Sequence, residues 1–157
     1  MNNLPKRKEI RLKDYDYSSN GYYFVTICTN NKQPFIEKHR KEIERILRSL
    51  PIKFPGLILD YYCLMSTHLH MILIFDKVDV TLSQIVRTFK ALVTKIIGEQ
   101  SLWQRNYYEH VIRTEKALSK IREYIQNNPL IERIRFEQFY ESGSMNRAPT
   151  NTNGLSM

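Results

Sequence analysis

Residues 57–75 read LILDYYCLMSTHLHMILIF, a segment with the composition of a β-hairpin. Residues 57–64 and 67–75 are dense in Leu, Ile, Tyr and other apolar side chains, which favours two strands. Only a short bend around Ser66 separates the two runs. We therefore predict that two consecutive strands pair in the middle of the chain.

Helical periodicity is present on both sides of this predicted hairpin. Before it, apolar side chains recur at the spacing of one helix face from about residue 38 onward: Ile43, Ile46, Leu47 and Leu50. Pro51 and Pro55 are expected to end this first helix. After the hairpin, apolar residues keep the helical period over residues 82–97, and Thr81 and Gln84 have the spacing of a capping box. Both segments are predicted to be amphipathic helices.

Two further strands and a last helix complete the predicted order. Residues 22–29 (YYFVTICT) are rich in aromatic and β-branched side chains, and residues 107–113 suit a short edge strand. Thr114 is expected to cap a helix over 115–128, which Pro129 ends. The order β-α-β-β-α-β-α predicts the α+β class with a ferredoxin-like, split βαβ plan. In this plan an antiparallel sheet has its helices mainly on one face.

The composition indicates one folded domain. The chain has 157 residues, 42% of them hydrophobic and two of them cysteine, which suits a packed core without a disulfide scaffold. The most apolar runs, 22–29 and 71–75, are far shorter than the roughly 20 residues of a membrane-spanning helix. We predict one catalytic domain over 1–141 that begins with a lead-in arm over 1–20, a disordered tail over 142–157, and a cytoplasmic location.

Charge gives the first indication of a partner. Lysine and arginine number 24 against 16 aspartates and glutamates, so the net charge is +8 and the isoelectric point is about 9.5. A basic surface of this kind is typical of proteins that bind phosphate-rich partners such as nucleic acids. Many proteins without such a partner are also basic, so charge by itself favours nucleic-acid binding only slightly.

Two histidines in the predicted hairpin could bind one metal ion together. His68 and His70 are two residues apart on one strand, so both side chains point to the same face. Two imidazoles can converge there on one metal ion, although such pairs are also common without a metal. Tyr124 and Asn128 lie one helical turn apart on the last predicted helix. The Asn128 amide oxygen could be a third ligand, and the Tyr124 hydroxyl would then lie beside the metal as a nucleophile. Position alone leaves open whether these two are instead a core-flanking tyrosine and a helix cap.

Three motifs together resemble a known family. They are CLMSTHLH at 63–70, WQRNYYEHVIR at 103–113 and YIQNNP at 124–129. In order and spacing they resemble the single-tyrosine transposases of the His-hydrophobic-His superfamily, above all the branch of REP-associated tyrosine transposases. The likeness extends over about residues 22–129. Members of this family share the split βαβ fold and cut single-stranded DNA at or near hairpins.

The resemblance implies a role for each candidate residue. His68 and His70 match the family's paired metal ligands, and Asn128 matches the polar residue that completes the metal site. The implied metal is Mg²⁺ or Mn²⁺. Tyr124 matches the catalytic tyrosine, which attacks a phosphate and leaves a 5′-phosphotyrosine and a free 3′-hydroxyl. The two residues before His68 depart from the family, which usually has Pro and Asn or a close variant there.

The resemblance also implies DNA as the partner. Single-stranded or hairpin DNA is expected to be contacted by basic side chains of the long helix and the second motif: Arg87, Lys90, Lys95, Arg105 and Arg113. It further implies a bacterial protein associated with the nucleoid. Both a monomer and a homodimer stay open.

Two other functions are compatible with parts of the pattern. A non-catalytic module with an RRM-like fold would bind single-stranded nucleic acid, but the aromatic signature of such sheets does not match. A metal-dependent nuclease that uses water would need an acidic cluster, and no paired carboxylates stand near the two histidines in the sequence. We therefore predict a metal-dependent DNA strand transferase, with the RRM-like binding module as the alternative.

Overall fold

The computed structural model describes residue 16 and residues 20–127. Its strands are β1 (Gly21–Cys28), β2 (Leu57–Leu64), β3 (His68–Phe75) and β4 (Tyr108–Ile112). Its helices are the short 3-10 turn η1 (Asn30–Lys32), α1 (Phe35–Lys38), α2 (Arg40–Lys53), α3 (Leu82–Ile97) and α4 (Glu115–Asn127). All of the predicted strands and helices are therefore present, while η1 and α1 were not predicted.

Several sequence predictions lie outside the described residues. They concern the lead-in arm over 1–20, apart from Asp16 and Asn20, the tail over 142–157, and Asn128 after the last helix. These stay predictions. None of the helices in the described part of the chain is long and apolar enough to cross a membrane.

The four strands form one antiparallel sheet in the order β2-β3-β1-β4. The hairpin predicted from residues 57–75 is present as β2 and β3. β1 and β3 occupy the centre of the sheet, and β4 is an edge strand, as predicted. The α+β class and the split βαβ plan are thereby confirmed.

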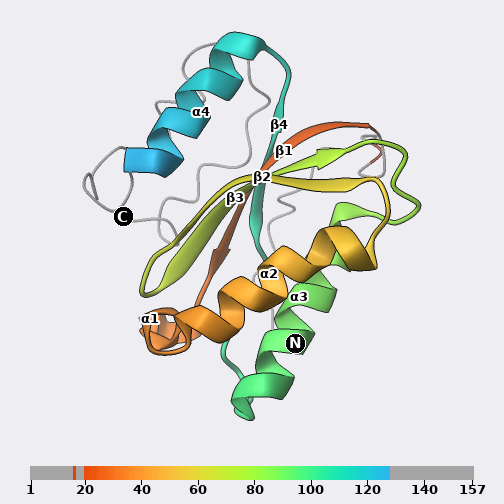
Figure 1. Ribbon diagram of the computed structural model, residues 1–157. Coiled ribbons are helices and arrows are strands. Elements are labelled where there is room, and N and C mark those ends of the chain that lie inside the picture. Colours follow the sequence, from red (N-terminus) through yellow and green to blue (C-terminus); the bar gives the residue numbers. More distant parts are fainter. Residues whose placement is uncertain (1–15, 17–19, 128–157) are drawn as a thin grey trace, which may run out of the picture.

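Helices lie on both sides of the sheet (Figure 1). α2 and α3 pack on one face, against alternate β1 residues such as Tyr23, Val25 and Ile27. α4 packs on the other face, where Phe24 and Ile72 are buried beneath it. Alternate side chains of a strand point to opposite faces, so helices on both sides explain why β1 is apolar nearly throughout. Two of the three long helices thus share one face, and α4 alone covers the other.

The helix ends follow local chemistry. The Thr81 side chain accepts from the Gln84 backbone N–H and the Gln84 side chain accepts from the Thr81 N–H, so the predicted capping box of α3 is present. The preceding helix, α2, continues past Pro51 and ends at Lys53, before Pro55, so the prediction that Pro51 ends it is wrong. A proline in the last turn removes only one helical hydrogen bond, and the Phe54 N–H still bonds the Leu50 carbonyl at 2.9 Å.

Candidate active site

The histidine pair lies at the start of β3, on the sheet face covered by α4. β3 pairs with β1 so that His68 is opposite Cys28 and His70 is opposite Thr26. The two imidazole rings are 4.9 Å apart between their centroids. Both side chains therefore share one face of the sheet, as residues two apart on a strand should.

Threonine hydroxyls contact both rings at the same nitrogen. His70 Nδ1 is 2.8 Å from Thr26 Oγ1, and His68 Nδ1 is 3.2 Å from Thr67 Oγ1. A hydroxyl that accepts from Nδ1–H fixes the tautomer whose Nε2 carries the lone pair needed for a metal. His68 Nε2 is buried and has no hydrogen-bond partner within the described residues. A buried acceptor left in this way is costly, and a bound cation would satisfy it.

Burial keeps both imidazoles neutral. It lowers the pKa of His68 to about 4. His70 is fully buried, and this desolvation, with a smaller contribution from the neighbouring His68, lowers the pKa of His70 well below its ordinary value of 6.5. Near neutral pH both rings are therefore in the uncharged form that can bind a cation.

Helix α4 brings Tyr124 to the same place from above the sheet. The helix starts at the predicted cap, where the Ala117 N–H donates to the Thr114 hydroxyl at 3.1 Å. The ring centroids of Tyr124 and His70 are 5.3 Å apart, and the Tyr124 and Phe24 rings meet edge to face at 6.3 Å. Tyr124 is only 2% exposed, so its ring is also part of the core beneath α4. The two predicted ligand histidines and the predicted nucleophile thus lie together.

The fourth predicted site residue, Asn128, directly follows the described end of α4. Within the part of the chain that the structure describes, no group of three or more His, Cys, Asp or Glu side chains is arranged as a metal site. Among the described residues, side chains of these four types therefore do not complete a site around the histidine pair.

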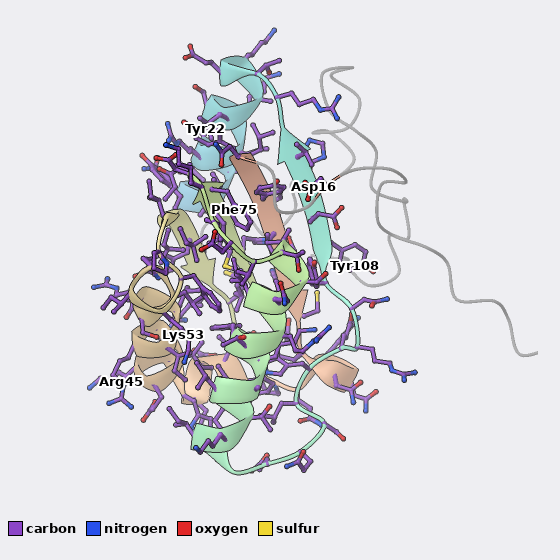
Figure 2. All side chains as sticks on the ribbon, turned by 90° about the vertical axis from the view of Figure 1, so that its right-hand side faces the viewer. Asp16, Tyr22, Arg45, Lys53, Phe75 and Tyr108 are labelled. Atoms are coloured by element: carbon purple, nitrogen blue, oxygen red, sulfur yellow. The ribbon has the colours of Figure 1, made fainter. Side chains whose placement is uncertain are left out.

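The two tyrosines of the second motif, Tyr107 and Tyr108, lie in environments that differ from that of Tyr124. Tyr107 is buried on the α3 side of the sheet, where its hydroxyl is 2.8 Å from Ser83 Oγ. Tyr108 begins the edge strand β4, opposite Thr26, and Figure 2 shows it on the far side of the molecule from the α2 surface. Tyr124, by comparison, packs directly on the ring of His70.

The second motif also braces the end of β1. Trp103 packs on aromatic rings of the core, and the Gln104 N–H donates to the Cys28 carbonyl at 2.9 Å. Lys90, which we predicted to contact DNA, donates from its ammonium to the carbonyl oxygens of Gln104 and Asn106 at 2.8 and 3.1 Å. These bonds give Lys90 a structural role that the sequence did not reveal. Its contact with DNA stays a prediction.

The other predicted DNA-contacting residues do not form one group. Arg87 and Lys95 are exposed on α3, which packs on the sheet face opposite the histidines. Arg105, before the start of the edge strand β4, and Arg113, directly after its end, are also exposed.

The chain matches a known family over most of its length. The family model described as "Transposase IS200 like" covers residues 17–128, which include every described strand and helix. The chain belongs to this family. The resemblance to single-tyrosine transposases inferred from the three motifs is thereby confirmed.

Individual relatives of this chain include REP-associated proteins. An uncharacterised protein of Haemophilus influenzae is 36% identical over 160 residues, covering 80% of this chain and 89% of the relative. A REP-associated tyrosine transposase of Escherichia coli is 24% identical over 119 residues, covering 73% of this chain and 69% of the relative. A solved structure of a REP-associated tyrosine transposase bound to a REP hairpin has a TM-score of 0.71 at 22% identity, covering 80% of this chain and 74% of that one. That likeness shows the same fold.

The sequence did not reveal the threonines that hold the histidines. Thr26 lies on another strand, and its place beside His70 follows only from the register of β1 on β3. Thr67 is one of the two residues that depart from the family, and its hydroxyl contacts the His68 ring. The departure from the family pattern drew attention to Thr67 without indicating its contact with His68, whereas no local feature of the sequence marked Thr26.

Proposed function

We propose that this chain cleaves and rejoins single-stranded or hairpin DNA in a divalent-metal-dependent reaction, through a 5′-phosphotyrosine on Tyr124. The observation that carries the proposal is the packing of Tyr124 on His70, 5.3 Å between ring centroids, beside a His68 Nε2 that lacks a hydrogen-bond partner among the described residues. Membership of the IS200-like transposase family supports a reaction on DNA strands.

The donor atoms present fit a divalent cation. His68 and His70 are neutral, and His68 Nε2, which has no hydrogen-bond partner among the described residues, is the proposed metal-binding atom of that ring. Asn128, four residues after Tyr124 in the sequence, is proposed to add an amide oxygen. Mixed nitrogen and oxygen ligands suit Mn²⁺, and Mg²⁺ is the alternative with its stronger preference for oxygen. A cation held there would act as a Lewis acid on a scissile phosphate.

Tyr124 supplies the nucleophile of the proposed reaction. Its hydroxyl oxygen bonds the phosphorus and its proton passes to solvent, while the bond from phosphorus to the upstream 3′-oxygen breaks and that oxygen takes up a proton. The downstream strand keeps its 5′-phosphate, now esterified to Tyr124. Attack by a 3′-hydroxyl on this ester reverses the bond changes and rejoins two strands. A tyrosine phenol has a pKa of about 10, so it can leave in the reverse step without an energy-rich cofactor.

DNA is the proposed partner. The solved relative is bound to a REP hairpin, and this chain has a net charge of +8 that would attract phosphates. Arg105 and Arg113, which are exposed before the start and after the end of β4, are proposed to contact the DNA backbone, as are the exposed Arg87 and Lys95 of α3. Such contacts position the strand and carry no sequence information themselves.

The position of α4 disfavours the RRM-like binding module. Such modules stack bases on aromatic side chains of an open sheet face. Phe24, on the central strand β1, is 1% exposed because α4 covers it. The opposite face is covered by α2 and α3. The described sheet therefore lacks an open aromatic platform at its centre.

A covalent trapping experiment tests the proposed function. The chain is incubated with Mn²⁺ and a pool of hairpin oligonucleotides with randomised single-stranded flanks, and is then denatured. A 3′ label is expected to appear in a band of protein plus DNA, whereas a 5′ label leaves with the 3′-hydroxyl fragment. Cleavage without the covalent band would indicate a nuclease that uses water, and a native gel shift without cleavage would indicate a binding module. Either result would contradict the proposal.

A further inference from the structure

Strand β2 contains a β-bulge beneath α4. Its pairing with β3 changes register between Leu59 and Tyr62, where β2 has one residue more than its partner strand. Asp60 and Tyr61 therefore form the bulge. Adjacent residues of a regular strand point to opposite faces, but here both side chains reach the same residue of α4, Arg122.

Arg122 is held in two ways by this bulge. Its Nε and Nη2 donate to the two carboxylate oxygens of Asp60 at 2.8 and 3.0 Å. Its guanidinium also lies over the Tyr61 ring, 5.2 Å from the centroid. The Asp60 side chain is only 15% exposed and that of Arg122 33%. A bidentate pair of this kind fixes direction as well as distance, which a single-point surface ion pair does not.

Arg122 and Tyr124 lie on opposite flanks of α4. The stripe of α4 that faces the sheet includes Ala117, Ile121 and Ile125. At about 100° per residue, Arg122 and Tyr124 are separated by about 160° around the helix axis. A rotation of the helix about its own axis would therefore lift one side chain from the sheet as it lowers the other. For a side-chain tip about 6 Å from the axis, a rotation of about 10° is a displacement of about 1 Å.

We propose that Arg122, held by its contacts with Asp60 and Tyr61 of the bulge, sets the rotation of α4 about the helix axis and so positions Tyr124 against His70. Arg122 is then a positioning residue for the nucleophile, and this inference rests on the proposed function of Tyr124. α4 packs on β2 and β3, so the contact of Arg122 with β2 acts directly where the helix packs on the sheet. A misplacement of about 1 Å can cost on the order of 100-fold in rate.

Asp60→Asn tests this inference, because it keeps the shape of the side chain and removes the carboxylate charge to which Arg122 donates. The rate of adduct formation is measured with the 3′-labelled hairpin pool at saturating DNA and Mn²⁺, together with the affinity for the pool. We expect a rate about 10- to 100-fold lower with unchanged affinity. Arg122→Gln is expected to behave in the same way. The double variant should be no slower than the slower single variant, because both changes remove one contact.

Arg48→Gln is the matched control. Arg48 also contacts a carboxylate and a tyrosine, Glu44 at 3.4 Å and the Tyr62 hydroxyl at 2.8 Å, but it lies on α2 across the sheet. Its substitution is expected to leave the rate unchanged. A wild-type rate in Asp60→Asn, or an equal loss in Arg48→Gln, would overturn the inference. Lower hairpin affinity in Arg122→Gln with a normal rate in Asp60→Asn would show a DNA contact instead.

Hydrogen exchange separates this inference from the proposed function. Asp60→Asn is expected to speed the exchange of α4 amides and to leave the amides of α2 and α3 unchanged. Unchanged exchange in α4 would overturn the inference whatever the activity. A wild-type chain that forms no adduct would contradict the proposed function. Faster α4 exchange in Asp60→Asn would then still support the inference that the Asp60–Arg122 contact holds α4 in place.

Discussion

Replacing either histidine should abolish DNA cleavage, but the two substitutions should differ in their effect on stability. His70 is fully buried, with Phe24 stacked at 5.6 Å, Tyr124 at 5.3 Å and a bond to Thr26. His70→Ala would leave a ring-sized cavity and a buried hydroxyl without its partner, which together cost about 3 kcal/mol. For a chain of this length we expect the melting midpoint to fall by about 6–12 °C.

His68 should be replaceable with little loss of stability. Its Nε2 is buried without a hydrogen-bond partner among the described residues, an arrangement that destabilises the metal-free fold. His68→Phe keeps a flat ring and removes this acceptor, at the cost of the 3.2 Å contact with Thr67. The two effects oppose each other, so we expect the free energy of unfolding to stay within about 1 kcal/mol of the wild type.

Three measurements distinguish a metal ligand from a packing residue. Thermal melts in the presence of a chelator give the stabilities, and the adduct assay over a Mn²⁺ titration gives the activities. Gel shifts without Mn²⁺ should show unchanged hairpin affinity, because basic side chains supply most of it. If His68→Phe cleaves at the wild-type Mn²⁺ concentration, His68 is not a metal ligand. If His70→Ala and His68→Phe have the same melting midpoint, the stabilising role assigned to the packing of His70 is wrong.

Three other substitutions separate structural from functional roles. Lys90→Met loses two charge-assisted bonds to backbone carbonyls and should destabilise the chain by about 2–3 kcal/mol, and a wild-type melt would contradict this. Tyr107→Phe loses the bond to Ser83, should cost about 1 kcal/mol and should still form the adduct, so a missing adduct would make Tyr107 the candidate nucleophile. Arg105→Ala should lower the slope of log affinity against log salt by about 1, and an unchanged slope would exclude a phosphate contact there.

The elements and their order could be predicted because their signals are local. The capping box of α3 needs only Thr81 and Gln84, and the cap of α4 needs only Thr114. Strand composition and a single short bend were enough for the β2–β3 hairpin. Once these elements alternate in this order, few compact arrangements remain, and the split βαβ sheet is one of them.

The parts that could not be predicted depend on contacts between distant segments. An apolar β1 indicates that both sheet faces are covered, but it does not say that α4 is the helix over the histidines. The β2 bulge is defined by the pairing with β3, and nothing in the local sequence around Asp60 marks it. Lys90 was predicted from its charge alone, and its bonds to the loop before β4 became visible only in the fold.

The candidate site was predicted only in part from its residue types. The His-x-His spacing indicates a shared face, and this spacing by itself also fits a site without a metal. The three motifs together supplied the link to Tyr124, which the structure places on the ring of His70. The roles of these residues in the reaction stay predictions.

Mapping the covalent adduct onto the chain tests the central proposal most directly. After trapping with Mn²⁺ and the hairpin pool, nuclease and trypsin would leave a nucleotide on one peptide. Trypsin cuts after Arg122 and Arg133, and the peptide 123–133 contains Tyr124 as its sole tyrosine. We expect mass spectrometry to find the 5′-phosphate ester on that peptide. DNA cleavage with the ester on a peptide containing Tyr107 or Tyr108, or with no modified peptide, would contradict the assignment of Tyr124 as the nucleophile.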